Sequence, residues 1–400
     1  MGIKKKILVL KGGSKGNVLR VASDEISLGF QKTGYEVVTI DLLDLEQRVQ
    51  FHAILETQEY AFIFSCQGVA LGTIKQAKKQ IGQLSKTPYI AWIFDDLMYH
   101  CDFLLKIEET DKEICLLEVD DEMREIAQCI NPVFHNIFHI LHGGFEVDRR
   151  PVKKDLDILY PGNFGEEPVM EQILLLSGED YSIFSNLIYE TIDLLLNEKM
   201  EITVREAFAQ ILESHQIDYT GQTHLELLAT GALKYVDMYI RYYYRKRTLI
   251  DLLEAGFYVS VIGEGYSEMS GRYPNLTVYG RKDIKEVISF MARSKIVCNP
   301  CPPVFRAGAH ERIFSAMLNK AVCLTPYSDY QENLFGNNLL FYKINKKEEM
   351  IEKVRYCIEH FDDLSSNLEE TYLFAQNHTW EKRGEEIIGL YEQYFRNDLG

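Results

Sequence analysis

Two successive series of short apolar segments limit the fold of this 400-residue chain more than any other feature. Residues 1–150 hold the first series and residues 151–380 the second. Within each series, amphipathic stretches of helical spacing separate the apolar segments. Continuous apolar strands that alternate with helices are typical of a parallel sheet covered by helices on both faces. The sequence therefore predicts an α/β protein with two Rossmann-like, doubly wound parallel-sheet domains.

The expected strands of the N-terminal domain lie at 7–10, 36–40, 61–65, 89–94, 113–118 and 135–141. Those of the C-terminal domain lie at 156–160, 258–263, 276–279, 296–299, 321–324 and 339–342. Residues 166–255 interrupt the second series with an almost wholly helical pattern, which predicts a large helical insertion. Residues 381–400 predict a closing C-terminal helix.

Charge and hydropathy exclude several classes of protein. The net charge of −17 argues against nonspecific binding of nucleic acid. No segment approaches the ~20 consecutive apolar residues of a transmembrane helix. The first apolar run stops at Lys11, too early for a signal peptide, so we expect a cytoplasmic protein.

Metal ligands are not grouped in the sequence. Eight cysteines are scattered along the chain, and Cys298 and Cys301 form the only C-x-x-C. No second pair or matching histidines lie nearby, as a zinc site would need. Three histidines at 135, 139 and 142 do not all fall on one face of a strand. We therefore expect no metal and no cofactor.

Residues that follow strands carry the chemistry of such sheets, because ligands bind outside the C-terminal ends of parallel strands. Gly12, Gly13 and Ser14 follow the first strand and predict a loop that lines a cleft, with a plain tight turn as the alternative. Asp95 and Asp96 follow the fourth strand. One of them is the candidate catalytic base, and two solvated helix caps are the alternative.

The strongest group of candidate residues lies in the second half, where glycines and polar residues follow three expected strands. They are Gly263, Glu264, Tyr279, Gly280, Arg281 and Gly308. Glycines at strand ends let the backbone approach a ligand closely. We assign these residues to the binding of a nucleotide.

A helix is expected to begin at Ala309, directly after this group. Glu311 and Ser315 share its solvent face, and Arg312 lies to the side. The helix N-terminus and Arg312 suit a diphosphate, and the Glu311 carboxylate suits a ribose diol. His310 falls near the apolar side, as a core histidine does. It completes the expected nucleotide-binding segment.

A segment rich in tyrosine and arginine, residues 235–247, stands out within the expected insertion. Both residue types are enriched at interfaces, which suggests a homodimer or an acceptor contact. A helix that packs on the sheet with its hydroxyls toward solvent is the alternative.

Motifs in the C-terminal half resemble the CgeB-like (spore maturation) glycosyltransferases, a bacterial GT-B family of the glycosyl transferases group 1 type. The resemblance extends from Val259 to about Trp380. The matching motifs are Gly263-Glu-Gly265, Val278-Tyr-Gly280, Ser294-Lys-Ile-Val-Cys-Asn299, 308–314, Ala321 and Arg355-Tyr-Cys-Ile-Glu-His360. In the N-terminal half, Phe94-Asp-Asp96 resembles the aromatic-Asp-Asp segment of that family, and 141–147 resembles its interdomain strand.

The resemblance implies a GT-B fold, with two domains facing a cleft. It also implies metal-independent transfer of a hexosyl or N-acetylhexosaminyl group from a nucleotide-diphosphate sugar to a protein, glycan or other cell-surface acceptor. Gly308 and Arg312 would line the diphosphate and ribose pocket, and residues 278–281 would meet the base.

One departure from the family pattern affects the ribose pocket. Ser315 stands where the family has a glutamate that holds the ribose hydroxyls. We expect Glu311, one turn earlier, to replace it. The departure leaves two alternatives open, a non-catalytic GT-B nucleotide-binding partner protein and a GT-B epimerase-like enzyme.

Overall fold

The computed structural model describes residues 6–57, 59–81, 86–108, 111–121, 123–132, 134–147, 152–164, 181–198, 202–218, 232–300 and 307–395. Cys301 and part of the expected insertion lie outside them. Contacts divide the chain into two compact units, each described by itself below. The first unit comprises Met1–Leu97, Asp102–Phe145 and Asn377–Gly400, and the second comprises Met98–Cys101 and Glu146–Gln376.

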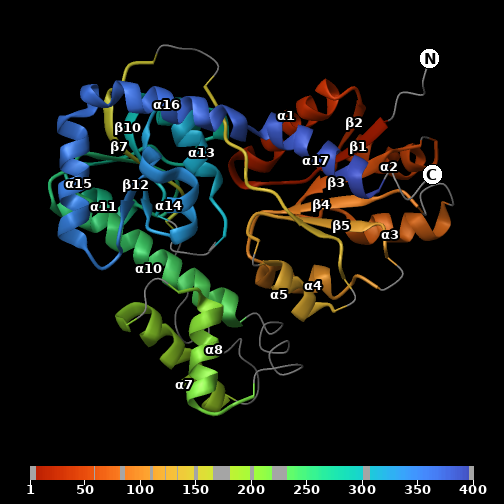
Figure 1. Ribbon diagram of the computed structural model, residues 1–400, viewed down its shortest axis with the longest axis horizontal. Helices are drawn as coiled ribbons and strands as arrows, with labels where there is room; N and C mark the ends of the chain where they lie inside the picture. The colour runs from red at the N-terminus through yellow and green to blue at the C-terminus, as the bar shows by residue number, and fades with distance from the viewer. Residues whose placement is uncertain are drawn as a thin grey trace. The chain divides into compact units, whose positions relative to one another are not determined.

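A parallel sheet of six strands, in the order β2-β1-β3-β4-β5-β6, forms the centre of the first unit (Figure 1). Its strands are β1 (Lys6–Lys11), β2 (Glu36–Asp41), β3 (Phe62–Cys66), β4 (Tyr89–Ile93), β5 (Ile114–Glu118) and β6 (Ile137–His139). Every residue of β3, β4 and β5 is buried, as expected of strands covered on both faces. The six predicted strands are confirmed.

Helices follow these strands along the chain. They are η1 (Lys15–Asn17), α1 (Val18–Lys32), α2 (Leu45–Thr57), α3 (Leu71–Gln80), η3 (Leu97–His100), α4 (Cys101–Leu104), α5 (Met123–Ile130), η7 (Gln376–His378) and α17 (Trp380–Tyr394). The C-terminal helix α17 packs on α1 within the first unit. Two glycines let the helices touch, because a Cβ at Gly384 would overlap the carbonyl oxygen of Ile26 and lie 3.0 Å from the Cα of Gly29.

The second unit contains a parallel sheet in the order β12-β11-β10-β7-β8-β9. Its strands are β7 (Leu156–Pro161), β8 (Val259–Ile262), β9 (Leu276–Val278), β10 (Ser294–Cys298), β11 (Val322–Pro326) and β12 (Leu340–Tyr342). Its helices include α11 (Ser267–Arg272), α12 (Ile284–Arg293), α13 (Glu311–Leu318), α14 (Asp329–Phe335), η5 (Gly336–Asn338), α15 (Lys347–Glu359), η6 (Phe361–Leu364) and α16 (Ser365–Ala375). These six predicted strands are confirmed as well.

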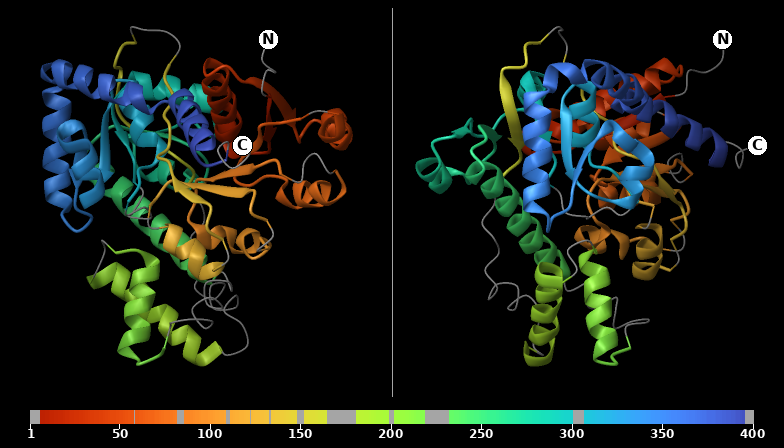
Figure 2. Two further views of the ribbon diagram at one scale, coloured as in Figure 1. Left: turned by 45° about the vertical axis from the view of Figure 1, so that its right-hand side comes forward. Right: turned by 60° about the vertical axis from the view of Figure 1, so that its left-hand side comes forward.

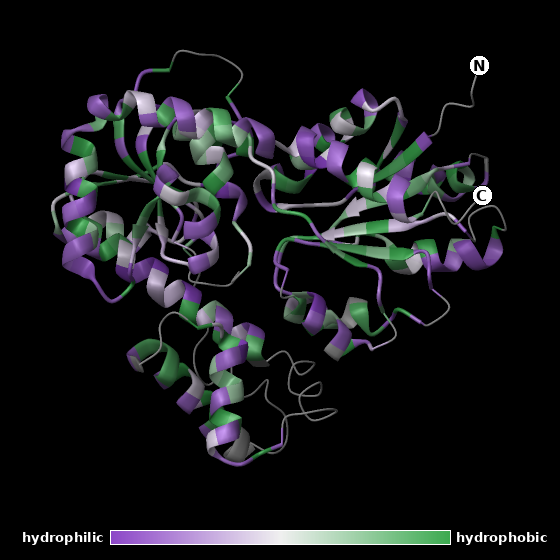
Figure 3. Cartoon of the chain, viewed as in Figure 1, coloured by the Kyte–Doolittle hydropathy of each residue, from purple (hydrophilic) through white to green (hydrophobic). Residues whose placement is uncertain are grey.

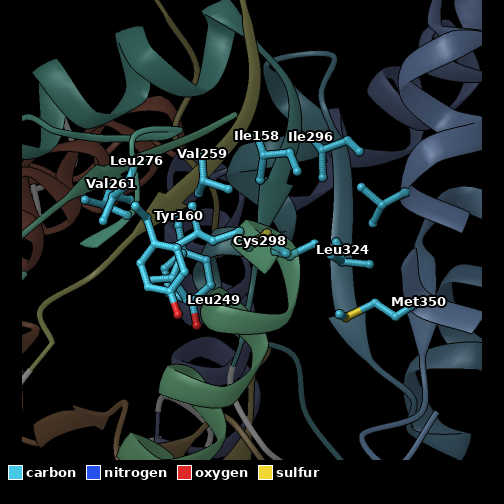
Figure 4. Packing of buried hydrophobic residues seen from close by; sticks show 14 of the residues in the cluster. Ile158, Tyr160, Leu249, Val259, Val261, Leu276, Ile296, Cys298, Leu324 and Met350 are labelled. Carbon is cyan, nitrogen blue, oxygen red and sulfur yellow. The ribbon is translucent and has the colours of Figure 1, made fainter. Parts of the chain in front are cut away.

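One face of the second sheet packs against α10 (Ala232–Glu254) and α15 (Figure 4). Ile158, Tyr160 and Leu249 belong to one buried cluster there, which also includes Leu324 and Met350. Burial of such side chains is the main contribution to the stability of this unit.

The N-terminal part of α10 forms a separate cluster with α7 (Tyr181–Asp193), η4 (Leu194–Glu198) and α8 (Val204–Ser214), as Figures 1 and 2 show. We call this cluster the helical module. Val236, Ile240 and Tyr244 of the tyrosine-rich segment are buried in it, and the Tyr244 hydroxyl donates to the Leu195 carbonyl at 2.7 Å. One face of that segment therefore packs within its own unit, and a homodimer through the segment stays a prediction.

Hydropathy follows the layers of each unit (Figure 3). The strands are mainly apolar, and the helices that cover them carry polar residues on their outer faces. Of the helices in the described ranges, none has the length and apolar character needed to cross a bilayer.

Candidate functional site

The strand order of the second unit reverses at the carboxyl ends of two neighbouring strands, β7 and β10. β7 pairs with β8 on one side and with β10 on the other. After β7, the chain adds β8 and β9 on one side of the sheet. It then returns to the other side of β7 with β10 and adds β11 and β12 beyond it. Helices that follow such a pair lie on opposite faces of the sheet, and ligands bind in the crevice between the loops.

Arg312 lies at this crevice. Its Nη1 donates to Oδ1 of Asn299, the residue after β10, at 2.9 Å. Its Nη2 lies 3.7 Å from the position that a Cβ would take at Gly162, the residue after β7. Asn299 is buried, and its Nδ2 donates to Oγ1 of Thr325 at 3.2 Å, which fixes the amide. A guanidinium is therefore held between the ends of β7 and β10.

The helix α13 begins at Glu311, two residues later than the sequence predicted. His310 is its N-cap residue, and the ring Nδ1 accepts from the backbone N–H of Arg312 at 3.1 Å. The interpretation of His310 as a core histidine is therefore wrong, because its ring caps the helix. The Ile313 N–H donates to the His310 carbonyl at 3.0 Å. The positive end of the helix dipole favours an anion beside Arg312.

Glu311 and Ser315 share one face of α13, but it is not the solvent face that the sequence predicted, because Ser315 is fully buried. The Ser315 hydroxyl donates to the Glu311 carboxylate. Burial raises the pKa of Glu311 above its usual value, while the Ser315 hydrogen bond and the charge of Arg312 lower it. The pair presents a carboxylate one turn earlier than a glutamate at position 315 would.

Glycine turns join the loops after β7, β8 and β9. A Cβ at Gly263, which has φ +144°, would overlap the carbonyl oxygen of Gly162. The Gly263 N–H also donates to the Gly280 carbonyl at 2.9 Å. The Gly308 carbonyl accepts from Gln331 Nε2 at 3.3 Å beside α13.

The other predicted donor-binding residues lie on the same strand ends. Glu264 and Arg281 are exposed, and the ring of Tyr279 packs against Phe290 with centroids 4.6 Å apart. Contact of these side chains with a nucleotide stays a prediction. Sequence reasoning did not assign Asn299 or Gly162 to the site, although both directly follow strands.

The candidate residues of the first unit follow β1 and β4. Gly12 packs against Val69 of the next loop, since a Cβ on Gly12 would lie 2.9 Å from Val69 Cγ2. Gly13 faces the Leu43 side chain, and the Ser14 hydroxyl accepts from the Leu19 N–H at 3.1 Å. Because β1 lies between β2 and β3, this loop also stands where the strand order reverses.

Asp95 and Asp96 differ sharply in their surroundings. Asp95 is exposed, and its Oδ2 accepts from Nε2 of Gln67 at 2.6 Å. Asp96 is only 3% exposed. A base that takes a proton from a bound substrate must be reachable, which favours Asp95 over Asp96 for the predicted catalytic role.

Glu118 in the first unit has a buried carboxyl group. It ends β5, is 1% exposed, and neither of its side-chain oxygens has a hydrogen-bond partner among the described residues. Burial, with smaller effects of the Asp96 and Asp120 charges, raises the pKa of Glu118 well above its usual value. Burial of a neutral carboxylic acid costs much less free energy than burial of an unpaired carboxylate, so Glu118 is expected to be protonated at neutral pH.

Replacing Glu118 by glutamine is expected to reduce the loss of stability at high pH. The folded wild type keeps a proton that the unfolded chain releases above about pH 4.3. Stability therefore falls as pH rises toward the folded pKa, by up to ~1.4 kcal/mol per pH unit. Urea unfolding at pH 5, 6.5 and 8 measures the trend, with Glu46→Gln on the exposed surface of α2 as the control. Parallel pH trends in wild type and Glu118→Gln would exclude a buried neutral acid.

Comparisons with known proteins agree with this architecture. Residues 245–389 match a family model described as "Glycosyl transferase-like". The matched stretch runs from α10 into α17. It contains the ends of β8, β9 and β10, together with α13. No curated protein sequence matches the chain significantly.

Several solved structures share the fold over nearly the whole chain. One is a glycosyltransferase from Rickettsia africae, with 11% identity, a TM-score of 0.52 and 98% of both chains covered. Anabaena HepE in complex with UDP-glucose has 11% identity and a TM-score of 0.52, over 96% of this chain and 98% of that one. Sucrose-phosphate synthase from Thermosynechococcus elongatus has 9% identity and a TM-score of 0.55, over 98% of this chain and 100% of that one. The predicted GT-B fold is confirmed.

Proposed function

We propose that the chain is a glycosyltransferase of the CgeB-like type, which uses a nucleotide-diphosphate sugar as its donor. The position of Arg312 carries the proposal. Its guanidinium lies between the ends of β7 and β10 beside the N-terminus of α13, where a diphosphate would meet a cation and the positive end of a helix dipole. The acceptor that we propose is a hydroxyl group of a protein, a glycan or another cell-surface molecule.

The proposed reaction needs charge compensation and a base. The C–O bond between the sugar and the diphosphate breaks while a new C–O bond forms to the acceptor. Arg312 and the helix N-terminus would stabilise the charge that develops on the leaving diphosphate, without a metal. In an inverting transfer, Asp95 would take the proton of the acceptor hydroxyl. Glu311, held by Ser315, would accept hydrogen bonds from the ribose diol.

A nucleotide screen followed by a turnover assay tests the function. UDP, GDP, ADP and dTDP are offered to the purified chain, and thermal shifts report binding. The matching nucleotide sugars are then followed for release of free sugar or for epimerisation. A thermal shift with sugar release supports a transferase. An epimerised donor would mark the epimerase-like alternative, and a thermal shift without turnover would mark a non-catalytic nucleotide-binding protein. The absence of any shift would contradict the proposed donor site and leave a partner protein that binds no nucleotide.

Replacing Glu311 by alanine is expected to weaken nucleotide binding by about 2–5 kcal/mol, because a desolvated hydrogen bond to a charged group is lost. Isothermal titration calorimetry with the nucleotide found in the screen measures the change. Glu352→Ala on the exposed surface of α15 is the control and should bind as the wild type does. Unchanged affinity in Glu311→Ala would remove this residue from the site.

A further inference from the structure

Gln67 ties the loop after β3 to the end of β4 through three hydrogen bonds. Its backbone N–H donates to the Trp92 carbonyl at 2.7 Å. Its side-chain Oε1 accepts from the Phe94 N–H at 3.3 Å. Its Nε2 donates to Asp95 Oδ2 at 2.6 Å. Both ends of the amide are therefore used, and this fixes which end faces the Asp95 carboxylate.

The backbone at Gln67 is in the left-handed region, with φ +59°. Residues other than glycine rarely adopt this conformation, because their Cβ crowds the following carbonyl. Ala70, in the same loop, has φ +65°. Unfavourable backbone conformations persist where the surrounding structure requires them, and they gather at functional sites. A glycine at position 67 would relieve the conformation but would lack the amide that reaches Asp95.

We propose that Gln67 is a positioning residue, which orients the Asp95 carboxylate to take the proton of the acceptor hydroxyl. This inference rests on the proposed function. The amide N–H holds Oδ2 and leaves the other carboxylate oxygen for the acceptor. When that oxygen takes the proton, the acceptor O–H bond breaks, the acceptor oxygen bonds to the sugar, and the diphosphate leaves with the electron pair of its C–O bond. Gln67 touches no reacting atom in this step.

The chain offers a matched control for Gln67. Gln216, just after α8, is also a glutamine with a left-handed backbone, φ +56°, and is exposed in the helical module. Gln67→Gly and Gln216→Gly therefore make the same chemical change at the same backbone conformation. Gln67→Glu adds a second comparison, because it keeps an oxygen for the Phe94 N–H and removes the donor to Asp95.

The test measures turnover, nucleotide affinity and melting temperature for each variant. The substrate is the nucleotide sugar that the wild type hydrolyses fastest among UDP-, GDP- and dTDP-sugars. Gln67→Gly and Gln67→Glu are expected to lower kcat about 100-fold, as misplacement of a catalytic group does. KM and the Kd of the nucleotide should stay within about twofold, because the donor-binding residues lie in the second unit. Gln216→Gly should keep the wild-type kcat.

A double mutant separates positioning from a merely structural role. If Gln67 acts through Asp95, adding Gln67→Gly to Asp95→Asn should cause little further loss, because the two residues act as a unit. Wild-type kcat in Gln67→Gly, or losses that multiply in the double mutant, would overturn the inference and leave the proposed function intact. A wild type that neither binds a nucleotide nor hydrolyses any nucleotide sugar would overturn both.

Discussion

Replacing Arg312 by glutamine is expected to weaken nucleotide-diphosphate binding by about 30- to 4,000-fold. The variant removes the guanidinium between β7 and β10 and leaves the buried Asn299 amide oxygen without its donor. Loss of one partner from a desolvated charged pair costs about 2–5 kcal/mol, and each 1.4 kcal/mol is tenfold in Kd. Turnover should fall further, by about 10²–10³, because the charge that stabilises the leaving diphosphate is absent. Calorimetry and steady-state kinetics measure the two effects.

Two further variants serve as comparisons for Arg312→Gln. Arg312→Lys keeps the positive charge and loses the planar fork, so its affinity should lie between those of wild type and Arg312→Gln. Arg355→Gln removes an exposed arginine from α15 in the same unit and should leave binding unchanged. Equal affinities for Arg312→Gln and Arg355→Gln would contradict a diphosphate site at the crevice.

Replacing Gly384 by alanine is expected to destabilise the first unit by about 3 kcal/mol or more. The added methyl would overlap the Ile26 carbonyl, so α17 must move away from α1. Overpacking of a tight contact typically costs 1–3 kcal/mol, and here the obstructing atoms are backbone atoms that cannot change rotamer. Differential scanning calorimetry should show a fall in Tm of about 6–12 °C.

Gly389 provides the control on the same helix. A Cβ built there meets no atom of another side chain or helix within 4 Å, and the residue is exposed. Gly389→Ala should therefore leave the Tm unchanged or raise it, because alanine favours a helix over glycine by ~1 kcal/mol. A similar fall in Tm for both variants would point to a general sensitivity of α17 and against the close contact with α1.

The strands could be predicted because each one contains a short run rich in apolar residues between polar loops. Every residue of β3, β4 and β5 is buried, so these strands show no alternation of buried and exposed residues. Their prediction rested on the length and spacing of the apolar runs. The segment around Arg312 was predicted as a nucleotide site for a related reason, and that role stays a prediction. A loop between a strand and a helix must present backbone N–H groups at the strand's carboxyl end, whatever its side chains are.

Features that depend on long-range packing could not be predicted. Nothing near Gln67 in the sequence indicates that its amide reaches Asp95, since the contact arises from the pairing of β3 with β4. The burial of Glu118 was equally hidden, because a glutamate at a strand end is normally solvated. The start of α13 was misplaced because histidine is an uncommon N-cap, and Ala309 has the better helix propensity.

The membership of α17 in the first unit has a consequence for biosynthesis. A ribosome makes the first unit's sheet early and its last helix only after the entire second unit. Until α17 emerges, aromatic residues that it covers, such as Trp92 and Phe62, lack their partners Trp380 and Tyr391. The nascent chain therefore exposes this apolar surface while the other unit is synthesised. Transiently exposed apolar surface of this kind is what chaperones bind.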